Sequence, residues 1–251
     1  MDINKTKSVT MTATRLREPN ATIRNYSIGQ AALSRVYSYK YLGVMLTSDL
    51  GWSEHVNYVV LKANRALGFI RRNLGPCSKE TKLKCYVTLV RPILEYASSV
   101  WDPYLASHVH LIEMVQRRAA RFVCNDYSME SSVTKMLNEL KLMDLRHRRK
   151  IARLSLFFKI DTGASQLVLP SEFTRKENRR TDNGKAYTHI SCRSHPFFGS
   201  FYPKTIRDWN ALPELLVNKE SVDSFVTNLK KNIFGEGHSD KIGNDALNRV
   251  S

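Results

Sequence analysis

The chain lacks the features that mark secreted and membrane proteins. Its apolar runs are far shorter than a membrane span, and the first residues, Met1 to Thr14, are polar and basic with no apolar stretch. Its four cysteines lie far apart without a C-x-x-C pair, so we expect free thiols in a reducing compartment and no disulfide framework. The expected location is therefore intracellular, cytoplasmic or nuclear, with neither secretion nor membrane insertion.

Signals of catalysis are also scarce. The sequence has no adjacent acidic pair, no glycine-rich phosphate loop, and no grouping of serine, histidine and aspartate with catalytic context. His189, Cys192 and His195 have H-x-x-C-x-x-H spacing, which offers three zinc ligands but no fourth nearby. Such residues would not converge in an extended strand, so ordinary loop residues are the favoured interpretation. We predict no catalytic residue and no metal ligand.

Positive charge is what the sequence has in excess. Lysine and arginine number 39 against 23 acidic residues, which gives a formal net charge of +16 and a pI near 9.8. A polyanion is the natural partner of such a chain, because each neutralised phosphate releases counterions. A solvated basic surface is the alternative for any single cluster, and an anionic membrane surface is a weaker one. With 251 residues, 42% of them hydrophobic, the chain can bury the core of one large domain or two small ones.

Three amphipathic helices between Trp52 and Asn125 are expected to organise the chain. The first is predicted to be capped by Ser53 and to end at Gly75 and Pro76. Ser78 is predicted to cap the second, whose apolar line runs to Trp101 and whose Pro92 predicts a kink. The third follows the turn at Asp102 and Pro103. Apolar residues at helical spacing support each helix: Val56, Val59, Val60, Ala63, Leu67, Ile70 and Leu74; Leu83, Tyr86, Val87, Val90, Leu94, Ala97 and Trp101; Val109, Ile112, Val115, Ala119 and Phe122.

The outer faces of these helices carry the best candidate binding residues. The first helix contributes Lys62, Arg65, Arg71 and Arg72, and the third contributes Arg117, Arg118 and Arg121. Arg118 and Arg121 are one helical turn apart and hence side by side. The alternative is structural, because Glu113 can pair with Arg117 or Arg118 across one turn.

Short strands are predicted before these helices. Residues 23–36 form two strands around Gly29 and residues 39–46 form a third. This part looks too small to fold alone as a sheet and resembles the end of a domain cut off at its front.

The segment after the three helices alternates helices and loops. Ser131 or Ser132 is expected to cap a short helix through Leu140, and Asp144 a longer one with a strongly basic outer face that ends near Gly163. A mobile loop over 165–182, an extended stretch over 187–201 and a last helix over 222–234, capped by Ser221, should follow. Core packing is favoured over base stacking for the aromatic cluster Phe197, Phe198, Phe201, Tyr202 and Trp209.

Several stretches, in this order, carry a family resemblance: "NKTK" at 4–7, "YKYLGV" at 39–44, "SDLGWSEHV" at 48–56, "KANRALGFIRRNL" at 62–74, "LVRPILEYASSVWDP" at 89–103, "VQRRAARFVCNDY" at 115–127 and "YPKTIRDWNALP" at 202–213. Together they resemble the carboxy-terminal part of reverse transcriptases from jockey-like, non-long-terminal-repeat (LINE-type) retrotransposons. The resemblance runs from about residue 3 to residue 234.

The resemblance implies a role for each part of the chain. Lys5 would lie near the incoming nucleotide at the end of the palm. The strand pair at 39–44, with Lys40, would lie against the primer end, where Gly43 lets the backbone approach nucleic acid closely. The three helices would form the thumb, which holds the template-primer duplex by its phosphates.

The expected fold is mainly α, with a small N-terminal β remnant of the palm sheet, a three-helix thumb and a helical C-terminal lobe. The expected divisions are residues 1–50 for the end of the palm, 51–127 for the thumb, 128–235 for a helical or mixed region and 236–251 for a flexible tail.

The resemblance also limits the expected activity. The family enzyme is an RNA-directed DNA polymerase whose palm aspartates, including a paired Asp-Asp turn, hold two Mg²⁺ ions. Those motifs precede the part of the family that this chain resembles, and Asp2 and Asp49 are isolated. We therefore expect no polymerase activity from this chain alone and no cofactor in it, with Mg²⁺ needed only by the full-length family enzyme.

The expected partners follow from the same resemblance. They are RNA, DNA or an RNA–DNA hybrid duplex, and the upstream palm and fingers, but no membrane. Two alternatives stay open: a non-catalytic helical interaction module, and a decayed transposon remnant that does not fold stably because its sheet edge lacks partner strands. A cooperative thermal transition would separate the second alternative from the others.

Overall fold

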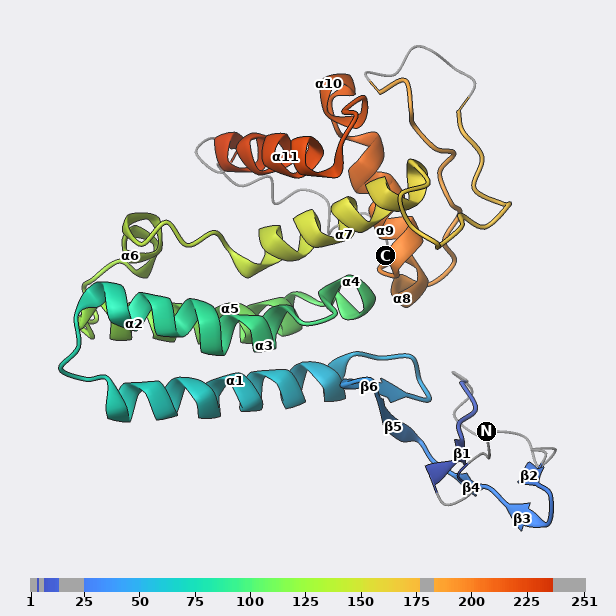
Figure 1. Cartoon of the computed structure of the whole chain (residues 1–251), viewed down its shortest axis with the longest axis horizontal. Coiled ribbons are helices and arrows are strands. Elements are labelled where there is room, and N and C mark those ends of the chain that lie inside the picture. Colours follow the sequence, from blue (N-terminus) through green and yellow to red (C-terminus); the bar gives the residue numbers. More distant parts are fainter. Residues whose placement is uncertain (1–3, 5–6, 14–24, 177–182, 237–251) are drawn as a thin grey trace. The chain divides into compact units, whose positions relative to one another are not determined.

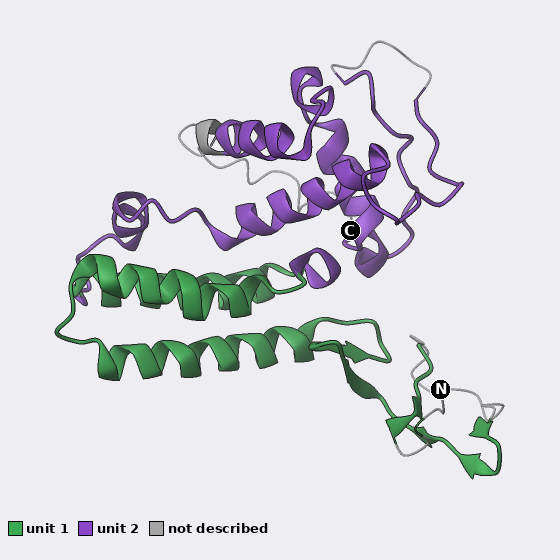
Figure 2. Ribbon diagram, in the orientation of Figure 1, with its two compact units in different colours: residues 1–97, 103–126 green, residues 98–102, 127–251 purple. Residues whose placement is uncertain are grey.

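The chain divides into two structural units. The computed structural model describes residues 4, 7–13, 25–176 and 183–236. Unit 1 combines residues 1–97 and 103–126, and unit 2 combines residues 98–102 and 127–251 (Figure 2). The described part of the chain is mainly helical, with small two-stranded sheets in its N-terminal part (Figure 1). The predicted fold class is therefore confirmed.

The strands of unit 1 are short and pair two by two. β1 (Val9–Thr10) pairs in parallel with β4 (Ser34–Arg35), and β2 (Ser27–Ile28) pairs antiparallel with β3 (Ala31–Ala32) across the turn at Gly29. Residues 14–24, which include the start of the predicted 23–36 strand segment, lie outside the described residues.

The single strand predicted over 39–46 from the sequence pattern is wrong, whereas the strand pair that the family resemblance implied at 39–44 is present. The segment is a hairpin in which β5 (Ser38–Tyr41) pairs antiparallel with β6 (Val44–Thr47). Its two-residue turn, Leu42 and Gly43, has φ angles of +45° and +86°. Positive φ at both turn residues matches the twist of the flanking strands, and glycine adopts this conformation at little cost.

Three helical segments pack together in unit 1. α1 (Ser53–Asn73) lies along the segment formed by α2 (Lys79–Cys85), a π-helical turn (Tyr86–Val90) and α3 (Arg91–Glu95), and both contact α5 (Ala106–Cys124) (Figure 1). Most of the apolar stripes predicted for α1 and α5 is buried, as are Tyr86, Val90 and Leu94, whereas Val60, Leu74 and Val109 are half-buried. The hydroxyl of Tyr86 donates to the side-chain oxygen of Gln116 at 2.9 Å inside this core.

The predicted helix ends are partly right. Ser78 caps α2, where its hydroxyl accepts the N–H of Thr81 at 3.3 Å. Ser53 is instead the first residue of α1, whose N-cap position is taken by Trp52 without a side-chain hydrogen bond. The irregularity expected at Pro92 is the π-helical turn that precedes it. A proline ring clashes with the carbonyl four residues earlier in a regular α-helix, and the wider turn relieves that constraint.

The second predicted helix does not continue to Trp101. It ends at Glu95, and Ala97 has a left-handed φ of +52° that breaks the helical path. The short helix α4 (Ser98–Trp101) then begins unit 2, where it contacts α7. Trp101 and Asp102 therefore belong to the structure of unit 2 and not to the three-helix part of unit 1.

Unit 2 is built around a long helix, α7 (Leu145–Asp161), preceded by α6 (Val133–Glu139). Ser132 caps α6 by accepting the N–H of Lys135 at 3.4 Å. Asp144 occupies the N-cap position of α7 without a side-chain cap bond. The core joins α7 to α9 (Phe201–Asn210), α10 (Glu214–Val217) and α11 (Val222–Glu236), and includes Phe157, Phe158, Trp209 and Phe225.

Sequence reasoning missed α9 and α10 and mistook part of the stretch before them. The extended segment predicted over 187–201 contains a one-turn helix, α8 (His195–Phe198), and α9 begins at its end. α11 begins as predicted, with the hydroxyl of Ser221 accepting the N–H of Ser224 at 3.2 Å. It continues past Gly235 to Glu236. Within the described residues, no helix combines the length and the apolar character needed to cross a membrane.

Candidate nucleic-acid interface

The outward face of α1 gathers basic and aromatic side chains in one stripe. At 100° per residue, its members fall within an arc of about 100° on the side opposite the buried stripe. Leu61 and Phe69 are 57% and 59% exposed, and the three basic residues are also exposed. α1 contains a single acidic residue, Glu54 in its first turn. We call this stripe the α1 outward face, formed by Tyr58, Leu61, Lys62, Arg65, Phe69 and Arg72.

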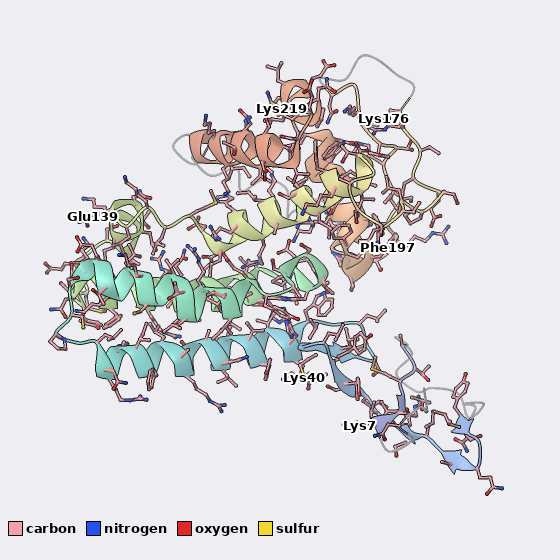
Figure 3. All side chains as sticks on the ribbon, in the orientation of Figure 1. Lys7, Lys40, Glu139, Lys176, Phe197 and Lys219 are labelled. Atoms are coloured by element: carbon pink, nitrogen blue, oxygen red, sulfur yellow. The ribbon has the colours of Figure 1, made fainter. Side chains whose placement is uncertain are left out.

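The hairpin extends this basic surface beyond the start of α1. Lys40, labelled in Figure 3, donates from Nζ to the hydroxyl of Tyr58 at 2.7 Å, and its Nζ lies 4.6 Å from the centre of the Tyr58 ring. The hydrogen bond from Lys40 lowers the pKa of the Tyr58 phenol. Ser38 of the same hairpin donates to Glu54 at 2.8 Å, which engages the one carboxylate of α1. Lys40 therefore lies next to the α1 outward face.

Gly43 has a neighbour inside the protein. A Cβ atom at this position would lie 3.1 Å from Cε1 of Tyr96, and the Tyr96 hydroxyl donates to the carbonyl of Leu42 at 3.0 Å. The absence of a side chain thus makes room for the Tyr96 ring, which is itself 58% exposed. Approach of nucleic acid at Gly43 stays a prediction.

His55 connects the hairpin to α1 through a hydrogen bond. Its side chain is 2% exposed, and its Nδ1 accepts the N–H of Met45 at 3.1 Å. Burial lowers the pKa of His55 from 6.5 to about 4, because the charged imidazolium is disfavoured away from water. The neutral ring is therefore the form that holds β6 against the first turn of α1.

We expect the stability of unit 1 to fall in mild acid because of His55. The unfolded chain protonates this group below pH 6.5 and the folded chain does so only near pH 4. The contribution is thus complete above pH 6.5 and falls by roughly 1.4 kcal/mol for each pH unit between these values. His55→Asn keeps an acceptor near Nδ1 without the titration. Urea unfolding of both proteins from pH 7 to pH 4.5 should give a flatter profile for the variant, and parallel profiles would contradict this account.

The remaining predicted basic residues of the helices do not share one face. Arg71 lies about 130° around α1 from the centre of the outward face, on the side of Asn64. Arg118 of α5 is exposed and donates to Asn64 at 3.2 Å, so these two arginines flank α1 on a second side. Arg117 and Arg121 are half-buried on α5. Lys5, the remaining predicted residue, lies outside the described residues.

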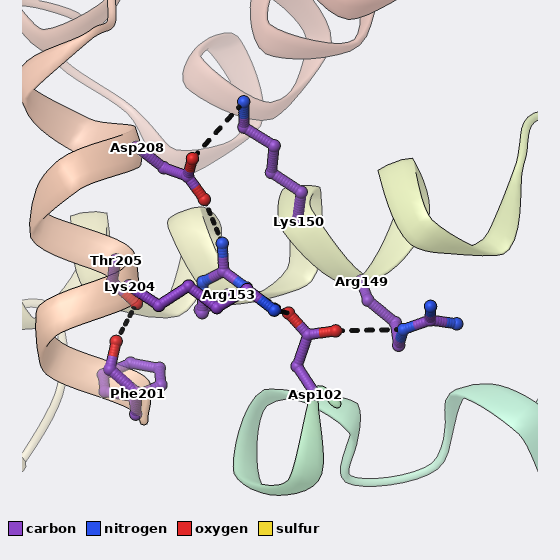
Figure 4. Close-up of polar contacts among 8 residues, drawn as sticks. All are labelled: Asp102, Arg149, Lys150, Arg153, Phe201, Lys204, Thr205 and Asp208. Atoms are coloured by element: carbon purple, nitrogen blue, oxygen red, sulfur yellow. Dashed lines mark hydrogen bonds and ion pairs between the residues drawn. The ribbon is translucent and has the colours of Figure 1, made fainter. Parts of the chain in front are cut away.

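The basic outer face predicted for α7 is partly wrong, because two of its arginines are buried. Arg149 and Arg153 are 0% and 1% exposed. Arg149 Nε donates to Asp102 at 3.0 Å, and Arg153 bridges Asp102 and Asp208 (Figure 4). Lys204 of α9 donates to the same Asp102 carboxylate at 2.6 Å. These charges therefore join α7 and α9 to the end of α4 and are not available to a polyanion.

This buried charge cluster has more cations than anions. Lys150 lies 3.6 Å from Asp208, so four basic residues share two carboxylates. Burial lowers the pKa of Lys204, and the nearby Asp102 carboxylate opposes that shift. Nη1 and Nη2 of Arg149 have no hydrogen-bond partner among the described residues. The stability of this cluster therefore depends strongly on its two carboxylates, those of Asp102 and Asp208.

The aromatic residues considered for base stacking in unit 2 differ in exposure, and the residues considered for metal binding do not form a site. Trp209 is buried in the core, and Tyr202 packs against that core and against Phe173 with ring centres 4.7 Å apart. The prediction of core packing is therefore confirmed for these two, whereas Phe197 and Phe198 are 45% and 48% exposed. No group of three His, Cys, Asp or Glu side chains in the described residues is arranged to hold a metal ion, the H-x-x-C-x-x-H residues included.

Comparisons with known proteins found no similar protein. No protein-family model matches the chain, and neither the curated proteins nor the solved structures give a match.

Proposed function

We propose that this chain is a nucleic-acid-gripping segment of a LINE-type reverse transcriptase. In this proposal the α1 outward face holds a template-primer duplex of RNA, DNA or both by its phosphates, inside the cell, where such duplexes form. The chain supplies the grip and not the polymerase chemistry, which belongs to the upstream palm and fingers and their Mg²⁺. The observation that carries the proposal is the α1 outward face itself.

The composition of the face supports a polyanion as its partner. Three exposed cations at helical spacing, Lys62, Arg65 and Arg72, lie one and two turns apart, and Lys40 continues the series beyond the helix. Basic side chains in a row follow a phosphate backbone, which carries a charge every few ångströms along each strand. Such contacts fix the position of the duplex but carry no sequence information. The proposal therefore implies binding that tolerates sequence.

The experiment that tests the proposal is a salt titration of binding to labelled duplexes. We expect the chain to bind a DNA duplex and an RNA–DNA hybrid of unrelated sequences with similar affinity. The affinity should fall linearly with the logarithm of salt concentration, with a slope of about −0.9 for each phosphate contacted on DNA. An affinity that is independent of salt, or confined to one sequence, would reject the phosphate grip.

A second candidate function is an interaction module for a protein partner. It is favoured by the exposure of Leu61 and Phe69 between the basic residues of the same face. An acidic amphipathic helix would bury these apolar groups and pair with the cations. The same titration separates the two functions, because a chain that serves only as a protein interaction module would not bind the duplexes with the salt slope of phosphate contacts.

A further inference from the structure

Unit 2 presents a pair of aromatic rings that its core leaves uncovered. Phe197 and Phe198 are adjacent on α8, and no residue of that helix is buried. Figure 3 labels Phe197 on the short helix next to α9. The two neighbouring phenyl rings are 45% and 48% exposed. They therefore leave in contact with water apolar surface that is normally buried in the core of a folded protein.

Hydrogen bonds define the backbone turn that carries these rings. The N–H of Phe198 donates to the carbonyl of Ser194 at 2.9 Å, and the N–H and the hydroxyl of Ser200 both donate to the carbonyl of Phe197, at 3.0 and 2.7 Å. Pro196 lies in the first turn of α8, where its ring restricts φ. The rings are thus presented by a hydrogen-bonded turn, which reduces the entropy lost when a ligand stacks on them.

A planar cation already stacks on one of the rings. The guanidinium carbon of Arg207, on α9, lies 3.4 Å from the centre of the Phe198 ring. This is the separation of stacked planes, and an arginine in such a position can itself stack on a base. Burial lowers the pKa of Arg207, and the neighbouring Asp208 carboxylate opposes that shift while it is engaged by Arg153 and Lys150.

The segment around the rings contains basic residues and no acidic ones. Residues 184–207 contain no aspartate or glutamate, but two lysines, two arginines and two histidines. An exposed aromatic pair, a stacked arginine and an acid-free segment are the components of sequence-tolerant single-strand binding sites. A duplex hides the faces of its bases, so only an unpaired strand can use the rings.

We propose that Phe197, Phe198 and Arg207 form a stacking site for the bases of single-stranded nucleic acid. This site lies in unit 2 and does not depend on the duplex grip proposed for α1. It gives the chain a second, chemically different contact, suited to an unpaired template or displaced strand next to a duplex.

Binding of the full chain to fluorescein-labelled oligo(dT) tests this proposal. Phe197→Ala combined with Phe198→Ala should weaken binding by at least about tenfold, because each stacked base loses its ring. The affinity for a blunt DNA duplex should stay unchanged. Leu215→Ala is the matched control, since Leu215 is apolar, 80% exposed and in the same unit. It should bind oligo(dT) like the wild type.

A second pair of variants separates stacking from charge and from folding. Phe197→Trp with Phe198→Trp should retain oligo(dT) binding, and the oligonucleotide should quench its added indole fluorescence. Arg207→Lys keeps the charge but loses the planar group, so it should bind more weakly. The proposal is overturned if the double alanine variant binds like Leu215→Ala, if the tryptophan variant loses binding, or if single-strand and duplex binding weaken in equal proportion. If the wild-type chain binds oligo(dT) but not the blunt duplex, the grip proposed at α1 is overturned and this site is retained.

Discussion

Replacing Asp102 by Asn is expected to lower the free energy of unfolding of unit 2 by about 3–5 kcal/mol, the usual cost of removing one partner from a buried ion pair. The side chain of Asp102 is 8% exposed and accepts bonds from Arg149, Arg153 and Lys204. Asparagine keeps the size but removes the negative charge. The four cations of the cluster would then face a single carboxylate, that of Asp208.

The unfolding of unit 2 can be followed separately from that of unit 1. Trp101 and Trp209 belong to unit 2 and Trp52 to unit 1, so tryptophan fluorescence in a Trp52→Phe background reports on unit 2 alone. Asp144→Asn is the matched control. It makes the same chemical change next to α7 at a side chain that is 53% exposed and lies 3.8 Å from His147. Its effect should stay below about 1 kcal/mol. Equal urea midpoints for the two variants would show that the buried cluster does not hold unit 2 together.

Neutralising the α1 outward face should have the second large effect. The change of Lys62, Arg65 and Arg72 to Gln removes three exposed cations and keeps residues that favour helix. Because each lost phosphate contact forfeits its counterion release, duplex affinity at about 0.1 M salt should fall on the order of 10- to 100-fold. Fluorescence anisotropy with a labelled blunt duplex measures the loss, and circular dichroism checks that the helix content is retained.

A control of equal charge shows whether the position of these residues matters. Lys135, Lys159 and Lys230 are exposed lysines of unit 2, and their joint change to Gln alters the net charge by the same three units. Duplex affinity should then change by no more than about threefold, because only the general field of the protein is altered. Similar losses for the two triple variants would mean that the net charge, and not the α1 outward face, attracts the duplex.

The helices of unit 1 were predictable because their signals are local. The apolar stripe of α1 has helical spacing, and serine caps α2, α6 and α11 at the predicted positions. The residue pattern alone did not indicate the hairpin, because Leu42, an apolar residue, takes the first turn position, where positive φ is usual for Asn, Asp or Gly. α9 was missed because Phe201, Tyr202 and Pro203 hide its start, although proline is tolerated in the first turn.

The buried arginines of α7 show that a basic run in the sequence does not by itself predict a basic surface in the structure. Arg149 and Arg153 belong to a basic run in the sequence, but their partner Asp102 lies 47 and 51 residues away along the chain. No local pattern indicates such a pair. One signal was present: Leu145, Arg149 and Arg153 are spaced one turn apart on the buried side of α7. On α1, by contrast, helical spacing predicted Lys62, Arg65 and Arg72 of the outward face, although Arg71 was grouped with them and the neighbouring Tyr58, Leu61 and Phe69 were not singled out.

The salt dependence of the triple α1 variant tests the central claim most directly. Duplex DNA binding of the wild type and of the Lys62, Arg65 and Arg72 variant would be measured from 50 to about 250 mM salt. If all three residues contact phosphates, the slope of log affinity against log salt should become shallower by about 2.7, which is about 0.9 for each contact. Parallel lines for the two proteins would contradict the claim that the α1 outward face grips the duplex.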